Sequence, residues 1–284
     1  MNNPRDLIPI FDKLGYVVEE ELATVIYLML QLEKPLLLEG NPGVGKTEVA
    51  NILAAYKDID LIRLQCYEGL DVNNAIYEWN YQKQLLAIKL QEQSDRSIKE
   101  KEDLIFGEDY LLKRPLLEAI TSERQVVLLI DEIDRADEEF EAFLLELLSV
   151  FQISIPELGT IHAKQKPIVI LTSNRTRELS DALKRRCLYH WVNYPSPEKE
   201  IRILKKHIPD IENKLALQIA EYVEKIRTLK LDKPPGIAET IDWAKGILAL
   251  KNGADNPEIS LSCLLKSDHD IELTKQEVFS APQS

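Results

Sequence analysis

The sequence contains few cysteines, and they follow no recognisable pattern. Cys66, Cys187 and Cys263 lie far apart and are odd in number. They provide neither a disulfide framework nor the closely paired ligands of a zinc site. Reduced thiols in a cytoplasmic protein are therefore the expectation.

Long uncharged apolar stretches are also missing. No such run reaches the roughly 18–20 residues that a membrane-spanning helix needs, and residues 1–12 do not have the form of a signal peptide. Basic residues are in deficit, because 35 Lys and Arg face 48 Asp and Glu, giving a net charge of −13. These features predict a protein with no membrane span and no nucleic acid as its main partner.

The chain has enough apolar residues to build a substantial core. It has 284 residues, of which 45% are hydrophobic. That length fits one large domain or two modest ones, and the composition argues against disorder of the whole chain.

A glycine-rich segment after an apolar run is the most informative motif. Residues 35–39 predict a buried strand and residues 46–56 a helix, with Gly40–Thr47 between them. This segment fits the phosphate-loop pattern G-x-x-x-x-G-K-[ST], in which glycines let backbone N–H groups curl around phosphate oxygens. Lys46 can reach the β- and γ-phosphates, and the Thr47 hydroxyl can ligate Mg²⁺. The candidate nucleotide-binding residues are Gly40, Asn41, Pro42, Gly43, Val44, Gly45, Lys46, Thr47 and Asp131.

A second motif ends the apolar run at residues 125–130. Asp131 and Glu132 follow directly, at the carboxyl end of a predicted buried parallel strand. In a doubly wound sheet this edge also carries the phosphate loop. Asp131, together with Thr47, is a candidate Mg²⁺ ligand, and Glu132 is the candidate general base.

Three further polar residues are candidates for the same chemistry. Asn174 follows the predicted strand at 167–172 and can contact the γ-phosphate or orient the attacking water, or simply terminate the strand in a turn. Arg185 and Arg186 precede the predicted strand at 188–192. They are either a solvated basic pair or an arginine finger that reaches a neighbouring subunit's γ-phosphate.

Hydrophobic periodicity predicts the remaining elements. Helices are expected at 19–32, 81–91, 111–120, 137–151 and 179–186, a strand at 61–65, and a hairpin across 151–163. The charged stretch 92–103 reads as an exposed helix end or loop.

The prolines near residue 195 mark a boundary, because only helical patterns follow them. These cover 197–207, 214–228, 238–251 and 260–266, which divides the chain into domains 1–194 and 195–284. His269 lies between two aspartates and offers a metal ligand, or else belongs to a solvated tail.

These motifs, in this order and spacing, resemble those of the AAA+ ATPases. Gly40–Thr47, Val126–Glu132, Leu171–Asn174 and Leu183–Arg186 are similar to the Walker A, Walker B, sensor 1 and arginine-finger segments of that superfamily. The resemblance covers nearly the whole chain.

Further segments narrow the resemblance to the MoxR branch. It is carried by Gly15–Val18, Glu21–Ala23, Pro35–Gly40 and Asp131–Asp137. Within that branch, Arg114–Leu117 and Ala182–Cys187 resemble the CoxD-like subgroup, which is associated with maturation of carbon monoxide dehydrogenase.

The resemblance implies an α/β fold whose parallel five-stranded sheet has the order 5-1-4-3-2, together with a small α-helical lid. It implies binding of ATP and Mg²⁺ and self-association into a ring, commonly a hexamer. Such proteins act as chaperone-like ATPases that remodel client complexes, often metalloenzymes, alongside a partner with a von Willebrand factor A (VWA) domain. Residues 69–79 and 153–163 match two inserts that face the pore or client. One departure is that Pro234–Glu239 offers no sensor-2 arginine.

Other functions remain open at this stage. ATP occupancy can assemble a scaffold, with turnover incidental, so that the protein is a nucleotide-gated switch. A nucleic-acid motor of the same superfamily is disfavoured by the net charge of −13. A GTPase is disfavoured because the sequence has no Asn-Lys-x-Asp base-reading motif.

Overall fold

The computed structural model describes residues 3–91, 106–156, 158–250 and 254–280. The chain divides into two compact units. One combines residues 1–23, 40–49 and 191–284, and the other combines residues 24–39 and 50–190. We call the first the lid unit and the second the sheet unit, and each is described separately. The division at residue 194 that the sequence suggests stays a prediction.

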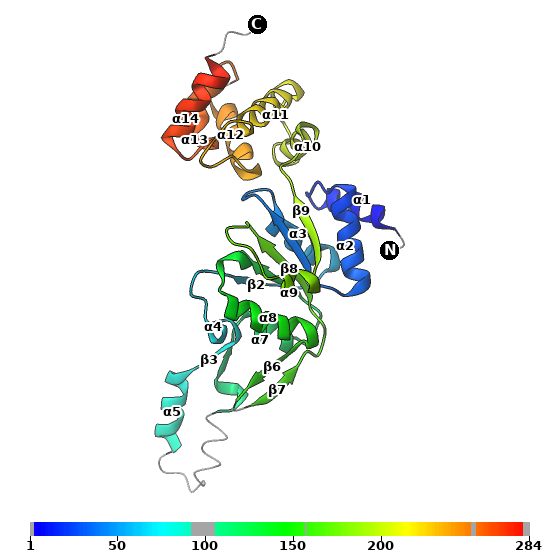
Figure 1. The fold of residues 1–284 in the computed structure, drawn as a ribbon, viewed down its shortest axis with the longest axis vertical. Helices are drawn as coiled ribbons and strands as arrows, with labels where there is room; N and C mark the ends of the chain where they lie inside the picture. The colour runs from blue at the N-terminus through cyan, green and yellow to red at the C-terminus, as the bar shows by residue number, and fades with distance from the viewer. Residues whose placement is uncertain (1–2, 92–105, 157, 251–253, 281–284) are drawn as a thin grey trace. The chain divides into compact units, whose positions relative to one another are not determined.

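Five strands form the central sheet (Figure 1), in the order β2-β5-β8-β1-β9. The pairs β1–β8, β5–β8 and β2–β5 are all parallel. Counted along these five strands alone, the order is 5-1-4-3-2 read from the other edge, so the expected α/β topology is confirmed. Their bounds are β1 (Leu36–Gly40), β2 (Leu61–Gln65), β5 (Val127–Asp131), β8 (Ile168–Ser173) and β9 (Leu188–Val192).

The centre of the sheet is buried on both faces. Every residue of β1 and β5 is buried, which explains why both strands read as continuous apolar runs rather than alternating ones. In the sheet unit, α7 (Pro115–Thr121) packs against β2 and β5. Helix α8 (Glu138–Val150) adds Phe140 and Leu144, both fully buried, to the same core. Asp137 caps α8 by accepting a hydrogen bond from the Phe140 amide.

A smaller substructure follows β2. Helix α4 (Val72–Ile76) leads into β3 (Tyr77–Trp79), which pairs antiparallel with β4 (Leu111–Lys113). The helix expected at 111–120 is therefore wrong over its first three residues, because they pair with β3. Figure 1 shows α5 (Tyr81–Gln91) lying away from the sheet. The charged stretch 92–103 lies outside the described residues.

Other connections agree with the sequence pattern. The expected hairpin is confirmed as β6 (Gln152–Ile155) paired with β7 (Gly159–His162). Helices α2 (Glu20–Leu32) and α3 (Lys46–Lys57) lie on either side of β1 in the chain, and α9 (Asp181–Arg186) precedes β9. Short 3₁₀ turns occur at η1 (Pro4–Asp6), η2 (Glu108–Tyr110), η3 (Ile133–Arg135) and η4 (Pro257–Ser260).

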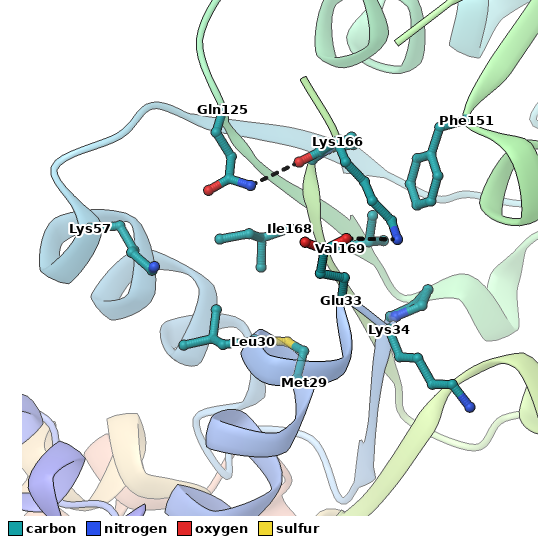
Figure 2. A pocket seen from close by; sticks show the side chains of 12 residues that line it. Met29, Leu30, Glu33, Lys34, Lys57, Gln125, Phe151, Lys166, Ile168 and Val169 are labelled. Atoms are coloured by element: carbon teal, nitrogen blue, oxygen red, sulfur yellow. Dashed lines mark hydrogen bonds and ion pairs between the residues drawn. The ribbon is translucent and has the colours of Figure 1, made fainter. Parts of the chain in front are cut away.

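A pocket of about 210 Å³ lies where β1 and β8 begin, at the amino ends of the strands (Figure 2). Three lysines line it, and Lys166 pairs with Glu33 and lies over the Phe151 ring. Lys57 belongs to the last turn of α3, where a cation complements the negative end of the helix dipole. This edge of the sheet is opposite to the one where the polar motif residues gather.

The lid unit has a separate apolar core built on helices. Trp243, which is fully buried, packs among α10 (Pro197–His207), α11 (Asn213–Arg227) and α12 (Ile237–Ala249). Figure 1 shows these helices grouped with α13 (Leu261–Leu264) and α14 (Asp268–Thr274). The π-helical turn at Lys275–Phe279 also contributes to this core through Val278.

The segment around His269 is therefore not a solvated tail. It forms α14, and the side chains of Asp270 and Thr274 on this helix are fully buried. The periodicity is hidden because α14 is short and its buried side chains are polar. The N-terminal helix α1 (Leu7–Lys13), which buries Leu7 and Phe11, is likewise absent from the sequence expectation.

No helix within the described ranges is long and apolar enough to cross a membrane.

A buried ion pair joins α10 to α11. Arg227 donates to both carboxylate oxygens of Glu200, at 2.7 and 2.9 Å, and also to the Pro235 carbonyl. We expect Glu200→Ala to lower the free energy of unfolding by about 3–5 kcal/mol, because it leaves a buried guanidinium without its counter-charge. Urea unfolding measures this, with the exposed Lys205→Ala on the same helix as control. Equal small losses in both variants would contradict the prediction.

Candidate functional site

The glycine-rich loop connects β1 to α3 and is held from within by its own lysine. The Lys46 ammonium donates to the carbonyls of Gly40 and Asn41, each at 2.8 Å. The side chain is only 6% exposed. Helix α3 begins at Lys46, so its free N–H groups and positive dipole end belong to the same loop. This is the arrangement that binds phosphate.

Within the lid unit, the segment before α12 contacts this loop through backbone atoms. The Ile237 amide at the start of α12 donates to the Gly43 carbonyl at 2.8 Å. A Cβ on Gly43 would lie 2.9 Å from the Gly236 Cα, and Gly43 has a φ of +75°. Two glycines are needed where the two backbones meet.

Tyr16 contacts the loop near Gly45. Its ring is 3.8 Å from where a Gly45 Cβ would be, and its hydroxyl lies 3.5 Å from the Gly45 carbonyl. Burial raises the pKa of Tyr16 far above its ordinary value. Val17 beside it packs into the helical core of the lid unit. The aromatic ring therefore covers the loop where the helix begins.

A second group of polar residues ends β5 in the sheet unit. Asp131, which is 2% exposed, accepts from Arg63 through Oδ2 and from the Thr172 hydroxyl through Oδ1, both at 2.5 Å. The Thr172 oxygen in turn accepts from the Glu132 amide at 2.9 Å. Glu132 has φ 55° and ψ 48°, a left-handed conformation that is uncommon for a side-chain-bearing residue. Such strain is typical of functional sites.

The Glu132 carboxylate is held by three side chains. Asn174 donates to Oε1 at 3.2 Å, and Gln65 donates to Oε2 at 3.1 Å. Arg135 pairs with the same Oε2 at 2.9 Å. The side chain remains 31% exposed, so the carboxylate is oriented and still open to solvent. This suits a general base that must reach a water molecule.

Asp134 fixes the segment that carries Asn174. Its carboxylate accepts from the backbone amides of Asn174 and Thr176, at 3.1 and 2.9 Å, and from the Thr176 hydroxyl at 2.7 Å. Burial alone raises the pKa of Asp134, but the hydrogen bonds from Thr176 and Asn174 outweigh burial and hold the pKa below its ordinary value of 3.8. The Asp134 carboxylate thus holds the backbone that follows β8 through charge-assisted hydrogen bonds.

Strand register brings these groups to one edge of the sheet. Leu171 of β8 pairs with Ile130, the residue before Asp131, and Ser173 pairs with Glu39 of β1. The carboxyl ends of β1, β5 and β8 therefore share this edge, and Glu39 is followed in the chain by Gly40. Ligands of open parallel sheets bind beyond this edge.

Comparison with known proteins decides the family. A profile of the ATPase family associated with various cellular activities (AAA) matches residues 36–192, more than half of the chain. This chain belongs to the AAA family. The match begins at β1 and ends at β9, so it covers all five sheet strands.

Solved structures with a similar fold include two mutants of RuvB from Thermotoga maritima. One matches with a TM-score of 0.53 and 17% identity, covering 92% of this chain and 70% of that one. The other has a TM-score of 0.51 and 18% identity, covering 91% and 69%. At this identity the likeness concerns the fold alone.

The structure brings together some of the residues predicted for the AAA site. Asp131, Glu132 and Asn174 form one hydrogen-bonded group, and Lys46 stabilises the loop. Arg185 and Arg186, at the end of α9, are exposed and take part in no ion pair or hydrogen bond within the described ranges.

Sequence reasoning missed several residues of this AAA site. Arg63 and Gln65 extend from the exposed face of β2, and Thr172 follows four apolar residues of β8. Alternation along β2 places both polar residues on one face, which is a usable signal. Nothing in the pattern around Thr172 indicates that its hydroxyl joins Asp131 to the Glu132 amide.

His269 lies within ligand distance of two carboxylates, those of Asp232 and Asp270. The two Asp270 oxygens already accept from the backbone amides of Asp232 and Lys233, at 2.9 and 3.2 Å. Asp270 therefore anchors the loop before α12. Asp232, His269 and Asp270 offer ligand atoms within 4.8 Å of one another, and the metal role considered for His269 stays a prediction.

The lowered pKa of Asp134 makes its contribution pH-dependent. We expect Asp134→Asn to lower the free energy of unfolding at pH 7 by about 2–3 kcal/mol, because a charged acceptor of three hydrogen bonds is lost. The group's folded pKa lies below its unfolded pKa, so the stabilisation is complete above the ordinary value of 3.8 and is lost as pH falls through the folded pKa. The difference in the free energy of unfolding between wild type and Asp134→Asn should therefore become smaller at acidic pH.

Urea unfolding across this pH range measures the gap. The exposed Glu123→Gln serves as control and should change little at either pH. A gap that widened in acid would contradict the assignment.

Proposed function

We propose that this AAA protein is a Mg²⁺-dependent ATPase whose hydrolysis drives rearrangement of a ring. One observation carries the proposal: the register of β1, β5 and β8 makes the phosphate-binding loop leave the sheet at the edge that holds Asp131 and Glu132. In this family that edge is where nucleoside triphosphate is cleaved.

The residues present fit the nucleotide and its metal. Loop residues 40–47 offer backbone N–H groups and the Lys46 ammonium to the phosphates. Thr47 and Asp131 are oxygen donors of the kind that Mg²⁺ takes. Bound Mg²⁺ neutralises charge that develops on the β- and γ-phosphates. The Arg63 guanidinium and Thr172 hydroxyl donate to Asp131 and hold its carboxylate in one orientation.

Glu132 is the proposed general base. Its carboxylate accepts a proton from the attacking water as the water oxygen bonds to the γ-phosphorus and the bridging oxygen–phosphorus bond breaks, so that ADP leaves together with phosphate. Asn174 donates to Glu132 Oε1 and so orients the base. From the same position its side-chain amide contacts the γ-phosphate of bound ATP. Asp134 holds the Asn174 backbone in place.

The assembly and client are proposed from the resemblance to the MoxR branch. On that basis the core at 1–194 and lid at 195–284 form a subunit of a hexameric ring, with Arg185 or Arg186 reaching the neighbour's nucleotide. The ring would remodel a client metalloenzyme alongside a VWA-domain partner. A nucleic-acid motor is a second function found in the superfamily, and the net charge of −13 argues against it here.

Glu132→Gln separates binding from turnover. The amide keeps the shape but cannot accept the water proton, so we expect ATP to bind with unchanged affinity while turnover falls at least 100-fold. Phosphate release and nucleotide titration measure the two. The exposed Glu178→Gln is the matched control and should turn over like wild type. Wild-type turnover in Glu132→Gln would remove the assigned base.

An arginine finger that acts between subunits predicts that ATPase activity returns when two inactive variants are mixed. Lys46→Ala subunits should not bind ATP, and subunits lacking the finger, Arg185→Ala or Arg186→Ala, should bind ATP without cleaving it. A mixed ring places an intact arginine beside an intact loop, so phosphate release should return in part for one of the two arginine variants. Lys184→Ala, which alters the same helix, should be active unmixed. If neither arginine variant recovers on mixing, the residues do not act between subunits.

A further inference from the structure

A pocket of about 400 Å³ lies in the lid unit, beside the phosphate-binding loop. One wall is Asn41–Gly43, and the opposite wall is the loop that runs from Asp232 to Gly236. We propose that Lys233, from this second loop, contacts the β- and γ-phosphates of bound nucleoside triphosphate and that Asp270 is the positioning residue that holds it there. The inference rests on the proposed function and deepens it.

The loop's place beside the nucleotide is fixed at its C-terminal end. The Ile237 amide donates to the Gly43 carbonyl, and Gly236 meets Gly43 so closely that a Cβ on Gly236 would lie 2.7 Å from the Gly43 Cα. Pro234 and Pro235 precede this contact and restrict the backbone by their fixed φ. Arg227, paired with buried Glu200, donates to the Pro235 carbonyl at 2.9 Å.

The N-terminal end of the loop is fixed by a buried charge. Asp270 on α14 is fully buried, and its two oxygens accept from the Asp232 and Lys233 amides. Charged acceptors make stronger hydrogen bonds than neutral ones. The backbone of Lys233 is therefore anchored on both sides, and only its side chain is left to move.

Among the cations of this pocket, Lys233 is the one available to a ligand. The Lys266 ammonium donates to the carbonyls of Ser262 and Cys263, at 3.2 and 2.8 Å. Lys233 is exposed, and its ammonium makes no hydrogen bond or ion pair with any residue that the structure describes. A long flexible side chain ending in a point charge is well suited to a phosphate.

Two carboxylates also line the pocket. Glu239 is occupied, because its Oε2 accepts from the Gly236 amide at 3.1 Å. Asp232 is 70% exposed and lies 3.9 Å from His269. Among the described residues, the Lys233 ammonium forms no hydrogen bond or ion pair with either carboxylate.

The position of Lys46 tells which phosphates Lys233 meets. The Lys46 ammonium lies at the Gly40 and Asn41 carbonyls, and the lysine of a phosphate loop serves the β- and γ-phosphates. Asn41, whose carbonyl accepts from the Lys46 ammonium, also lines the pocket. Lys233 thus adds a cation from the opposite loop to the pocket that Asn41–Gly43 line, and this cation should favour binding of ATP over ADP.

Binding of a non-hydrolysable ATP analogue and of ADP, each with Mg²⁺, tests this by titration calorimetry on the full chain. We expect Lys233→Ala to weaken the ATP analogue about tenfold, which equals about 1.4 kcal/mol, and ADP less than threefold. Lys233→Arg should keep wild-type preference, and Lys230→Ala, an exposed lysine just before the loop, should change neither affinity.

The possible outcomes distinguish failure of the Lys233 inference from failure of the proposed ATPase function. If wild type binds neither nucleotide, both the proposed function and the inference are overturned. If wild type binds both and Lys233→Ala keeps the same preference for the ATP analogue, only the inference is overturned.

The positioning role of Asp270 has its own test. Asp270→Asn should reduce the preference for the ATP analogue over ADP, because Lys233 is no longer held in place. In a Lys233→Ala background, Asp270→Asn should reduce that preference no further. Thermal unfolding checks that the variant is folded. Additive losses, or equal weakening of both nucleotides, would show that Asp270 supports the fold without placing Lys233.

Discussion

The parallel register of β1, β8 and β5 is the constraint on which the candidate site depends. It makes Glu39 pair with Ser173 and Leu171 pair with Ile130, so three strand ends finish at one edge. Everything polar at that edge follows from it: the loop that begins at Gly40, the carboxylates that follow β5, and the amide that follows β8. A slip of one residue would turn these side chains to the other face of the sheet.

Groups in the site are held by neighbouring side chains whose roles the motifs do not indicate. Thr172 connects Asp131 to the Glu132 backbone, and Asp134 fixes the segment with Asn174. In the lid unit, Asp270 does the same for the loop at Lys233. The chemistry of the site thus rests on buried hydrogen bonds that keep a few side chains in one arrangement before any ligand binds.

The sequence predicts the periodic elements well and the short ones poorly. Strands β2 and β9 and helices α5 and α10 have the expected bounds. Residues 111–113 look like the start of a helix, but pairing with β3 makes them a strand. The segment at Asp270 looks solvated, since nothing local indicates that its carboxylate is needed inside the lid unit.

The sequence by itself determined the nucleotide loop, the acidic strand end and the α/β class, because phosphate binding and parallel strands both demand particular residues in consecutive positions. Only the tertiary structure decided which distant residues serve them. Gly236 meets Gly43, Thr172 joins Asp131, and Asp270 reaches Lys233 across long separations in the chain. Such contacts depend on how helices and strands pack, and packing leaves no short-range pattern in the sequence.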